Sequence, residues 1–115
     1  MTFPPVPVPR GGGVRVPLEI KLKRDWQFNT RRRVFESDAG AAFVPGGLPK
    51  GTRIVYKTPN LARAPAATLN EHERELRRYM QIILPPGESP TTYLGAVRAW
   101  PPVEEAHPGP EVSLP

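Results

Sequence analysis

The chain has no cysteine and only two histidines among its 115 residues. Without cysteine, it cannot form a disulfide, a thiolate metal site or a cysteine nucleophile. General acid–base or covalent catalysis requires a placed and activated side chain, and two histidines leave little from which to build one. We therefore expect no enzymatic activity, no catalytic residue, no cofactor, no metal site and no small-molecule substrate.

Long hydrophobic runs are also missing. The longest apolar runs are four or five residues, far short of the roughly 20 that a membrane span requires. The first residues show no charged region followed by an apolar run, which is the pattern of a signal peptide. We expect neither a signal peptide nor a membrane span, and so a cytoplasmic or virion-associated protein, with the redox compartment left open.

Proline and glycine are abundant but unevenly placed. Seventeen prolines and ten glycines make up about a quarter of the chain, which approaches the range of irregular structure. Prolines crowd the first 17 residues and recur from Pro101 onward, and proline enforces an extended backbone. We expect an extended arm at residues 1–12, a small β-rich domain with one helix at 13–100, and an extended acidic tail at 101–115.

The charge is polarised along the chain. Residues 1–33 carry eight Lys or Arg against two acidic residues, whereas residues 87–115 carry four glutamates against Arg98. A basic segment favours an anionic partner, such as nucleic acid, an acidic protein surface or a membrane face. The alternative is that this charge serves only solubility.

The strongest β pattern runs from Val14 to Phe28, where apolar residues occupy the even positions and only Arg24 breaks the series. Strict alternation directs one face of a strand to a core and the other to water. It predicts one long strand, bent near Arg24. Shorter strands are predicted at 41–44, 52–57 and 91–100, the last with apolar residues on both faces.

The strongest helix pattern begins at Thr68, which forms a capping box with Glu71, and contains no Gly or Pro up to residue 84. Apolar residues and His72 recur at spacings of three and four and form one stripe, and three Glu–Arg pairs, Glu75–Arg78 among them, stand at helical spacing. These patterns predict an α+β fold: a small antiparallel sheet or partly open barrel with one helix at about 68–84.

Two motif candidates fail on spacing. The helix holds His72 among glutamates but lacks the second histidine of a zinc-binding helix, so His72 is interpreted as a residue at the boundary between core and solvent. The loop at 45–51 places Lys50 beside glycines. In a phosphate-binding loop the lysine precedes Ser or Thr and a helix, whereas here Gly51 and a strand follow.

The leading functional hypothesis is a non-enzymatic accessory subunit, a cementing or assembly protein of a large complex such as a virion shell. Extended arms of opposite charge are suited to binding neighbouring subunits. The residues predicted to contact a protein partner are Phe3, Pro4, Pro5, Val6, Pro7, Val8, Pro9, Trp100, Pro101 and Pro102.

The alternative is a basic nucleic-acid-binding module, associated with RNA or the ribosome. Three consecutive arginines flanked by aromatic residues suit phosphate neutralisation and base stacking. The residues predicted for this role are Lys21, Lys23, Arg24, Arg31, Arg32 and Arg33.

Overall fold

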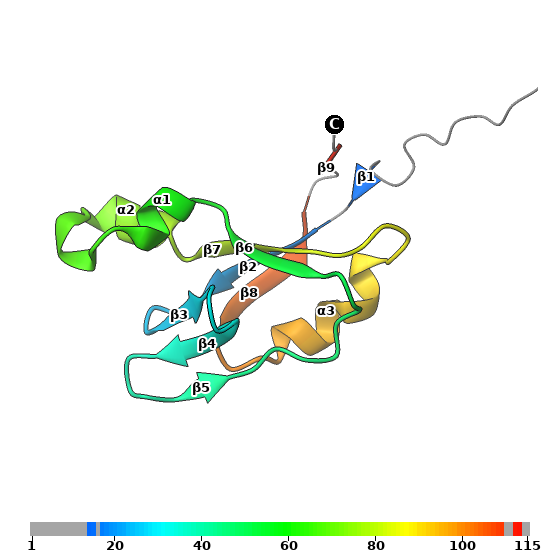
Figure 1. The fold of residues 1–115 in the computed structure, drawn as a ribbon, viewed down its shortest axis with the longest axis horizontal. Helices are drawn as coiled ribbons and strands as arrows, with labels where there is room; N and C mark the ends of the chain where they lie inside the picture. The colour runs from blue at the N-terminus through cyan, green and yellow to red at the C-terminus, as the bar shows by residue number, and fades with distance from the viewer. Residues whose placement is uncertain (1–13, 16, 110–111, 114–115) are drawn as a thin grey trace, which may run out of the picture.

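The computed structural model describes residues 14–15, 17–109 and 112–113, in which strands β1 to β6 come first and short helices and the remaining strands follow. Antiparallel pairs form a four-stranded sheet in the order β6-β7-β2-β8, a three-stranded sheet β3-β4-β5 and a two-stranded ribbon β1-β9 (Figure 1). The α+β class with small antiparallel sheets is confirmed, and the predicted arm at 1–12 lies outside the described residues. The elements are β1 (Val14–Arg15), β2 (Leu18–Leu22), β3 (Trp26–Asn29), β4 (Val34–Ser37), β5 (Ala42–Phe43), β6 (Arg53–Tyr56), α1 (Pro59–Arg63), the 3₁₀ turn η1 (Ala66–Thr68), α2 (Glu71–Leu76), β7 (Tyr79–Ile83), α3 (Pro90–Arg98), β8 (Val103–Pro108) and β9 (Val112–Ser113).

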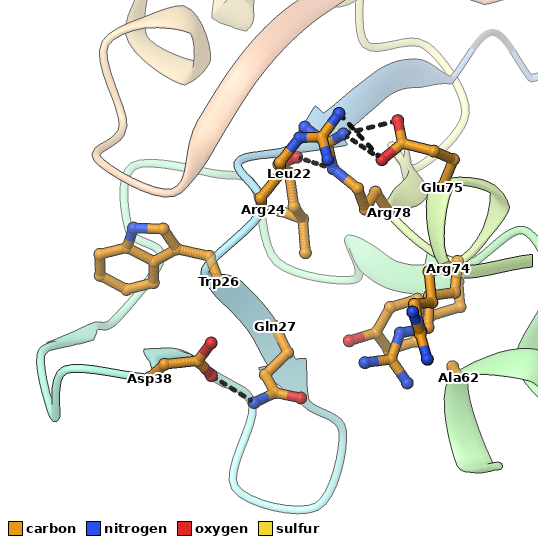
Figure 2. A pocket seen from close by; sticks show the side chains of 11 residues that line it. Leu22, Arg24, Trp26, Gln27, Asp38, Ala62, Arg74, Glu75 and Arg78 are labelled. Atoms are coloured by element: carbon orange, nitrogen blue, oxygen red, sulfur yellow. Dashed lines mark hydrogen bonds and ion pairs between the residues drawn. The ribbon is translucent and has the colours of Figure 1, made fainter. Parts of the chain in front are cut away.

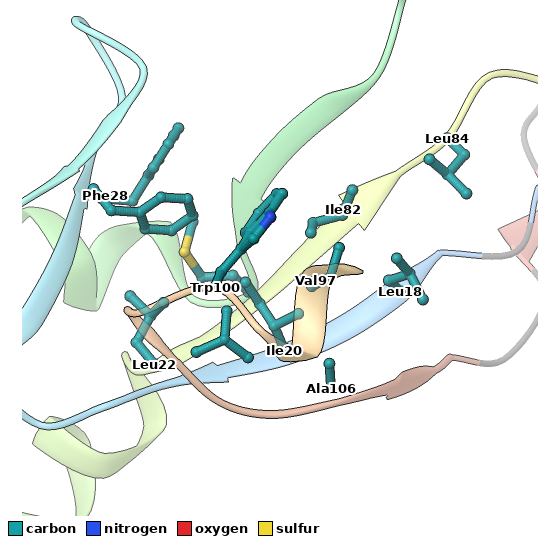
Figure 3. Close-up of a cluster of buried hydrophobic side chains, with 12 residues drawn as sticks. Leu18, Ile20, Leu22, Phe28, Ile82, Leu84, Val97, Trp100 and Ala106 are labelled. Carbon is teal, nitrogen blue, oxygen red and sulfur yellow. The ribbon is translucent and has the colours of Figure 1, made fainter. Parts of the chain in front are cut away.

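Strand β2 lies at the centre of the four-stranded sheet, between β7 and β8. Its alternation turns Leu18, Ile20 and Leu22 toward one face, where each is at most 2% exposed. Ile82 and Met80 stand opposite Leu18 and Ile20 on β7. This row is the base of the hydrophobic core (Figure 3).

Helix α3 and the three-stranded sheet cover the apolar face of the central sheet. Val97 and Trp100, at the end of α3, belong to the same buried cluster as Ile20. The Trp100 ring lies 5.9 Å from Phe35 and 5.4 Å from Phe43, measured between ring centroids. Such aromatic pairs add about 0.5–1.5 kcal/mol beyond the area that they bury, and they hold the three-stranded sheet against α3.

The prediction of one long strand from 14 to 28 is wrong. β2 and β3 belong to different sheets, and the chain turns between them, with Trp26 N donating to Lys23 O at 3.0 Å. The alternation continues in phase across this turn, so the two strands look like one in the sequence. The predicted bend at Arg24 falls inside the turn. The shorter strands predicted at 41–44 and 52–57 are confirmed as β5 and β6.

The predicted helix at 68–84 ends early. Helix α2 stops at Leu76 and is capped by Asn70 and Glu73, not by Thr68 and Glu71. From residue 79 the chain is strand β7, whose side chains are alternately buried and half-buried. β7 pairs with both β2 and β6, and this pairing outweighs the helical pattern. The predicted stripe therefore does not form, and His72 is exposed.

The predicted strand at 91–100 is helix α3. Pro90 occupies the first turn of the helix, where proline is favoured. Tyr93 and Val97 stand four residues apart, which places them on one face of the helix, and Trp100 follows just beyond the end of α3. These residues and Leu94 pack at the core, whereas Ala96 and Ala99 are exposed.

The predicted tail from residue 101 is also wrong for residues 103–108, which form β8 at the edge of the central sheet. Val103 and Ala106 are buried against the core, whereas Glu104 and Glu105 between them are exposed. The composition looked too polar to fold alone, but this strand folds on β2.

Candidate functional site

A groove with a volume of about 420 Å³ lies between the β3–β4 turn, the segment that joins β5 to β6, and strand β6. Its apolar lining includes Val44, Leu48 and Ile54, flanked by Pro45 and Pro49. Val44 is 69% exposed, and within the described part of the chain it is the large hydrophobic residue left exposed. The groove thus presents aliphatic surface to solvent.

Three basic residues line the same groove: Arg32, Arg33 and Lys50. Arg32 pairs with Glu36, with Nη1 3.2 Å from Oε2. Arg33 and Lys50 make no ion pair with the described residues, and the lining that the structure describes includes no acidic side chain. The groove is therefore both apolar and positively charged.

The β3–β4 turn fixes the position of these arginines. The Asn29 side-chain oxygen accepts hydrogen bonds from Arg31 N and Arg32 N, both at 3.0 Å. Arg33 N donates to the Asn29 carbonyl at 2.7 Å. Arg33 adopts a φ of 59°, a left-handed conformation that costs a residue other than glycine roughly 1 kcal/mol or more. The turn thus holds a charged side chain where glycine is the lower-energy choice.

Strand β6 borders the groove and forms one edge of the central sheet. Lys57 N donates to Tyr79 O at 3.1 Å. Hydrogen-bonded positions alternate along an antiparallel strand. In the β6–β7 register, the backbone groups of Arg53 and Val55 therefore form hydrogen bonds with β7. The backbone N–H and C=O of Ile54 therefore face away from β7, on the outer edge.

The Tyr56 hydroxyl joins the two walls of the groove. It accepts a hydrogen bond from Phe28 N at 2.7 Å and donates to Phe28 O at 3.1 Å. Burial raises the pKa of Tyr56 above its ordinary value, although the Phe28 backbone opposes the shift. The phenol therefore stays protonated and ties β6 to β3.

A second cavity, of about 200 Å³, lies between the β2–β3 turn and helices α1 and α2 (Figure 2). Four arginines line it: Arg24, Arg74, Arg77 and Arg78. Glu75 projects among them and lies 3.5 Å from Arg24. The hydrogen bond from Arg78, followed by the other nearby cations, holds the pKa of Glu75 below its ordinary value. Arg24 and Arg78 are thus paired within the molecule, whereas Arg74 and Arg77 make no ion pair with the described residues.

Arg78 is only 7% exposed, and its guanidinium binds other residues of the chain. Its Nε donates to Leu22 O at 2.9 Å, and its own carbonyl accepts from Leu22 N at 2.9 Å. Nη1 reaches both oxygens of Glu75, at 2.7 and 2.9 Å, and Nη2 lies 2.5 Å from Glu104. All three nitrogens of this guanidinium thus bind internal partners, and Arg78 completes the end of strand β2.

The buried Glu19 is likewise held by internal partners. Its carboxylate accepts hydrogen bonds from Lys57 Nζ and Gln81 Nε2, both at 2.7 Å. Burial would raise the pKa of Glu19, but these two hydrogen bonds and the nearby positive charges outweigh it and keep the pKa below its ordinary value. Glu19 therefore ties three strands together as a charged side chain.

The six residues predicted to contact nucleic acid do not gather on one surface. Lys21, Lys23 and Arg24 precede β3, whereas Arg31–Arg33 follow it, so the two groups lie at opposite ends of that strand. Lys21 faces Glu75 at 3.8 Å and Glu104 at 3.7 Å. Two of the six, Arg32 and Arg33, line the groove, whereas Arg31 does not.

The residues predicted to bind a protein partner are placed only in part. Phe3, Pro4, Pro5, Val6, Pro7, Val8 and Pro9 lie outside the described residues. Trp100 and Pro102 are buried in the core, and Pro101 is exposed between them. Within this short segment, Pro101 is therefore the residue that a partner can reach.

The groove is not evident in the sequence, because its walls come from segments that local patterns describe separately. Residues 45–51 looked like a loop marked by Pro and Gly, and 52–57 looked like an ordinary strand. One local indication was present: Val44 and Leu48 are aliphatic residues within a segment otherwise rich in Pro and Gly. That the arginine turn meets this segment follows from the tertiary fold alone.

Within residues 14–15, 17–109 and 112–113, no group of three or more His, Asp or Glu side chains is placed to hold a metal ion. Of the helices that the structure describes, none has the length and apolar character needed to cross a membrane. Comparison of the chain with protein-family models, curated proteins and solved structures found no match.

Proposed function

We propose that the chain is a non-enzymatic binding subunit of a larger protein assembly, such as a cementing or decorating subunit of a virion shell. The observation that carries this proposal is the groove beside β6. It exposes Val44 and leaves two cations unpaired within the described chain, whereas Arg78 and Glu19 have internal partners. A concave surface that combines an apolar lining with a few charged groups is a common form of binding site.

The proline-rich residues 1–12 remain predicted contact elements, because extended segments bind with little loss of entropy. Under this proposal the protein is cytoplasmic or virion-associated. The nucleic-acid alternative has less support, because its six predicted cations divide between the two ends of β3 and Lys21 is already paired.

The test is size-exclusion chromatography with light scattering on the tagged protein expressed in its native host. The sample is treated with nuclease and run at high salt. We expect the protein to co-elute with a large protein particle that survives both treatments. A free monomer that shifts only with RNA or DNA, and falls off as salt rises, would instead support nucleic-acid binding.

A further inference from the structure

We infer that the groove binds an acidic, extended segment of a protein partner, which adds as a strand to the outer edge of β6. This inference rests on the proposed function and names the chemistry of the partner at that site. The occupant is an acidic peptide because Arg33 and Lys50 line the groove without an ion pair in the described chain.

The backbone of β6 supplies the binding mode. The N–H and C=O of Ile54 face away from β7 on the edge of the sheet, and an extended peptide can pair with such an edge. At the opposite edge, Arg98 Nε donates to Ala106 O at 3.0 Å, and Pro108 has no N–H to offer. Such features blunt an edge strand, so β6 is the edge that remains available.

The side chains of the groove supply the selectivity. Successive residues of a bound strand point to opposite sides, so alternate residues would face the groove. There Val44, Leu48 and Ile54 line the same surface as Arg33 and Lys50. An occupant whose groove-facing residues are in part aliphatic and in part acidic therefore fits both parts of the lining.

Single-stranded nucleic acid fits this groove less well. Its bases need aromatic side chains on which to stack. The aromatic residue in the described lining is Phe28, which is 6% exposed and packs on Phe35 with ring centroids 4.7 Å apart. The remaining lining is mainly aliphatic or basic, with Gly51 and Thr52 beside Lys50, which favours a peptide.

The direct test is an NMR titration of the full chain with a capped peptide that repeats Glu-Glu-Val-Val, so that each face of the extended peptide carries both glutamate and valine. We expect saturable binding, with hydrogen exchange of the Ile54 amide slowed by about tenfold. The Val55 amide serves as an internal reference, because it already pairs with β7. A peptide with lysine in place of glutamate should not bind.

Paired variants with equal charge change locate the site. Arg33→Gln with Lys50→Gln should weaken peptide binding by about tenfold, as expected for the loss of two partly exposed ion pairs. Lys23→Gln with Arg31→Gln removes two exposed cations outside the groove lining and should change binding by less than about twofold. All four side chains are exposed, so each variant should fold. Thermal unfolding checks that it does.

Three results would overturn the inference: no saturable binding of the acidic peptide, equal weakening by both variant pairs, or tighter binding of oligothymidylate at the same amides. The size-exclusion experiment described above distinguishes failure of the peptide-binding inference from failure of the proposed assembly function. If the Arg33→Gln, Lys50→Gln protein still co-elutes fully with the particle, the groove is not the contact although the assembly role stands. If the wild type elutes free, the assembly role itself fails.

Discussion

The cavity lined by Arg24, Arg74, Arg77 and Arg78, here called the arginine cavity, and the groove beside β6 are both positively charged, but they differ in how that charge is paired. In the cavity, Arg78 donates to Glu75, Glu104 and the Leu22 carbonyl, and it is almost fully buried. In the groove, Arg33 and Lys50 have no acidic partner in the described chain. The charge of Arg78 is thus structural, and the groove is distinguished by unpaired cations that lie beside exposed aliphatic surface.

Replacing Arg78 should give the largest loss of stability. In Arg78→Met the buried Leu22 carbonyl loses its side-chain donor, which should lower the free energy of unfolding by about 1–3 kcal/mol. Glu75 and Glu104 are partly exposed and can be hydrated. The measurement is urea unfolding. Arg74→Met is the matched control, because this exposed arginine of the same cavity should change stability by only about 0.5 kcal/mol; equal losses would contradict the comparison.

Gly109→Ala should disturb the other internally paired charge. A Cβ at Gly109 would lie 2.6 Å from Glu19 Cγ, and Lys57 and Gln81 hold that side chain in place. Overpacking of this kind costs about 1–3 kcal/mol. Gly95→Ala is the control, since it meets open space in α3 and should stabilise the helix by about 0.5–1 kcal/mol. A neutral Gly109→Ala would show that Glu19 moves freely.

The replacement of Arg33 by glycine should separate stability from binding. Arg33→Gly relieves the left-handed backbone and should leave the free energy of unfolding unchanged or raise it by up to about 1 kcal/mol. Peptide binding should nevertheless weaken. Arg31→Gly, whose backbone does not have positive φ, should lose about 0.5 kcal/mol and keep binding. A marked loss of stability in Arg33→Gly would show that the Arg33 side chain stabilises the fold.

Lowering the pH should weaken the ion pairs of Glu19 and Glu75 and so lower the stability of the fold. The pKa values of Glu19 and Glu75 are lowered in the folded protein from an ordinary value of 4.5. Their contribution to stability is therefore present above pH 4.5 and is lost as the pH falls through the folded pKa values. Urea midpoints measured from pH 6 to pH 3 should decline below about pH 4.5. The decline should be shallower in Glu19→Gln, and an identical slope would contradict the role of Glu19.

Local patterns predicted individual elements better than their arrangement. Alternation located both β2 and β3, but it could not show that the chain changes sheets at Arg24. The Glu75–Arg78 pair was predicted from helical spacing and is present, yet Arg78 already lies beyond the end of α2. Residues 79–83 took their structure from strands distant in the sequence, which local patterns do not reveal. The helix at 90–98 did have a local indication, because Pro90 occupies its first turn.

For the candidate site, the sequence indicated the arginine turn but not its surroundings. Arg32 and Arg33 were named as binding residues, and both line the groove. Val44, Leu48 and Lys50 were interpreted as parts of a short strand and a loop. Their common role depends on the hydroxyl of Tyr56 meeting the backbone of Phe28, a contact across 28 positions of sequence.

The central place of β2 also sets the order in which the molecule can be completed during translation. A ribosome makes Leu18–Leu22 early, but the two neighbouring strands end at residues 83 and 108. At about 5–20 residues per second, the 86 positions from residue 22 to residue 108 take roughly 4–17 seconds. During this time β3, β4 and β5 can form their meander from adjacent residues, whereas the apolar row of β2 waits for its partners. A nascent chain stalled before β8 would therefore expose an aggregation-prone strand.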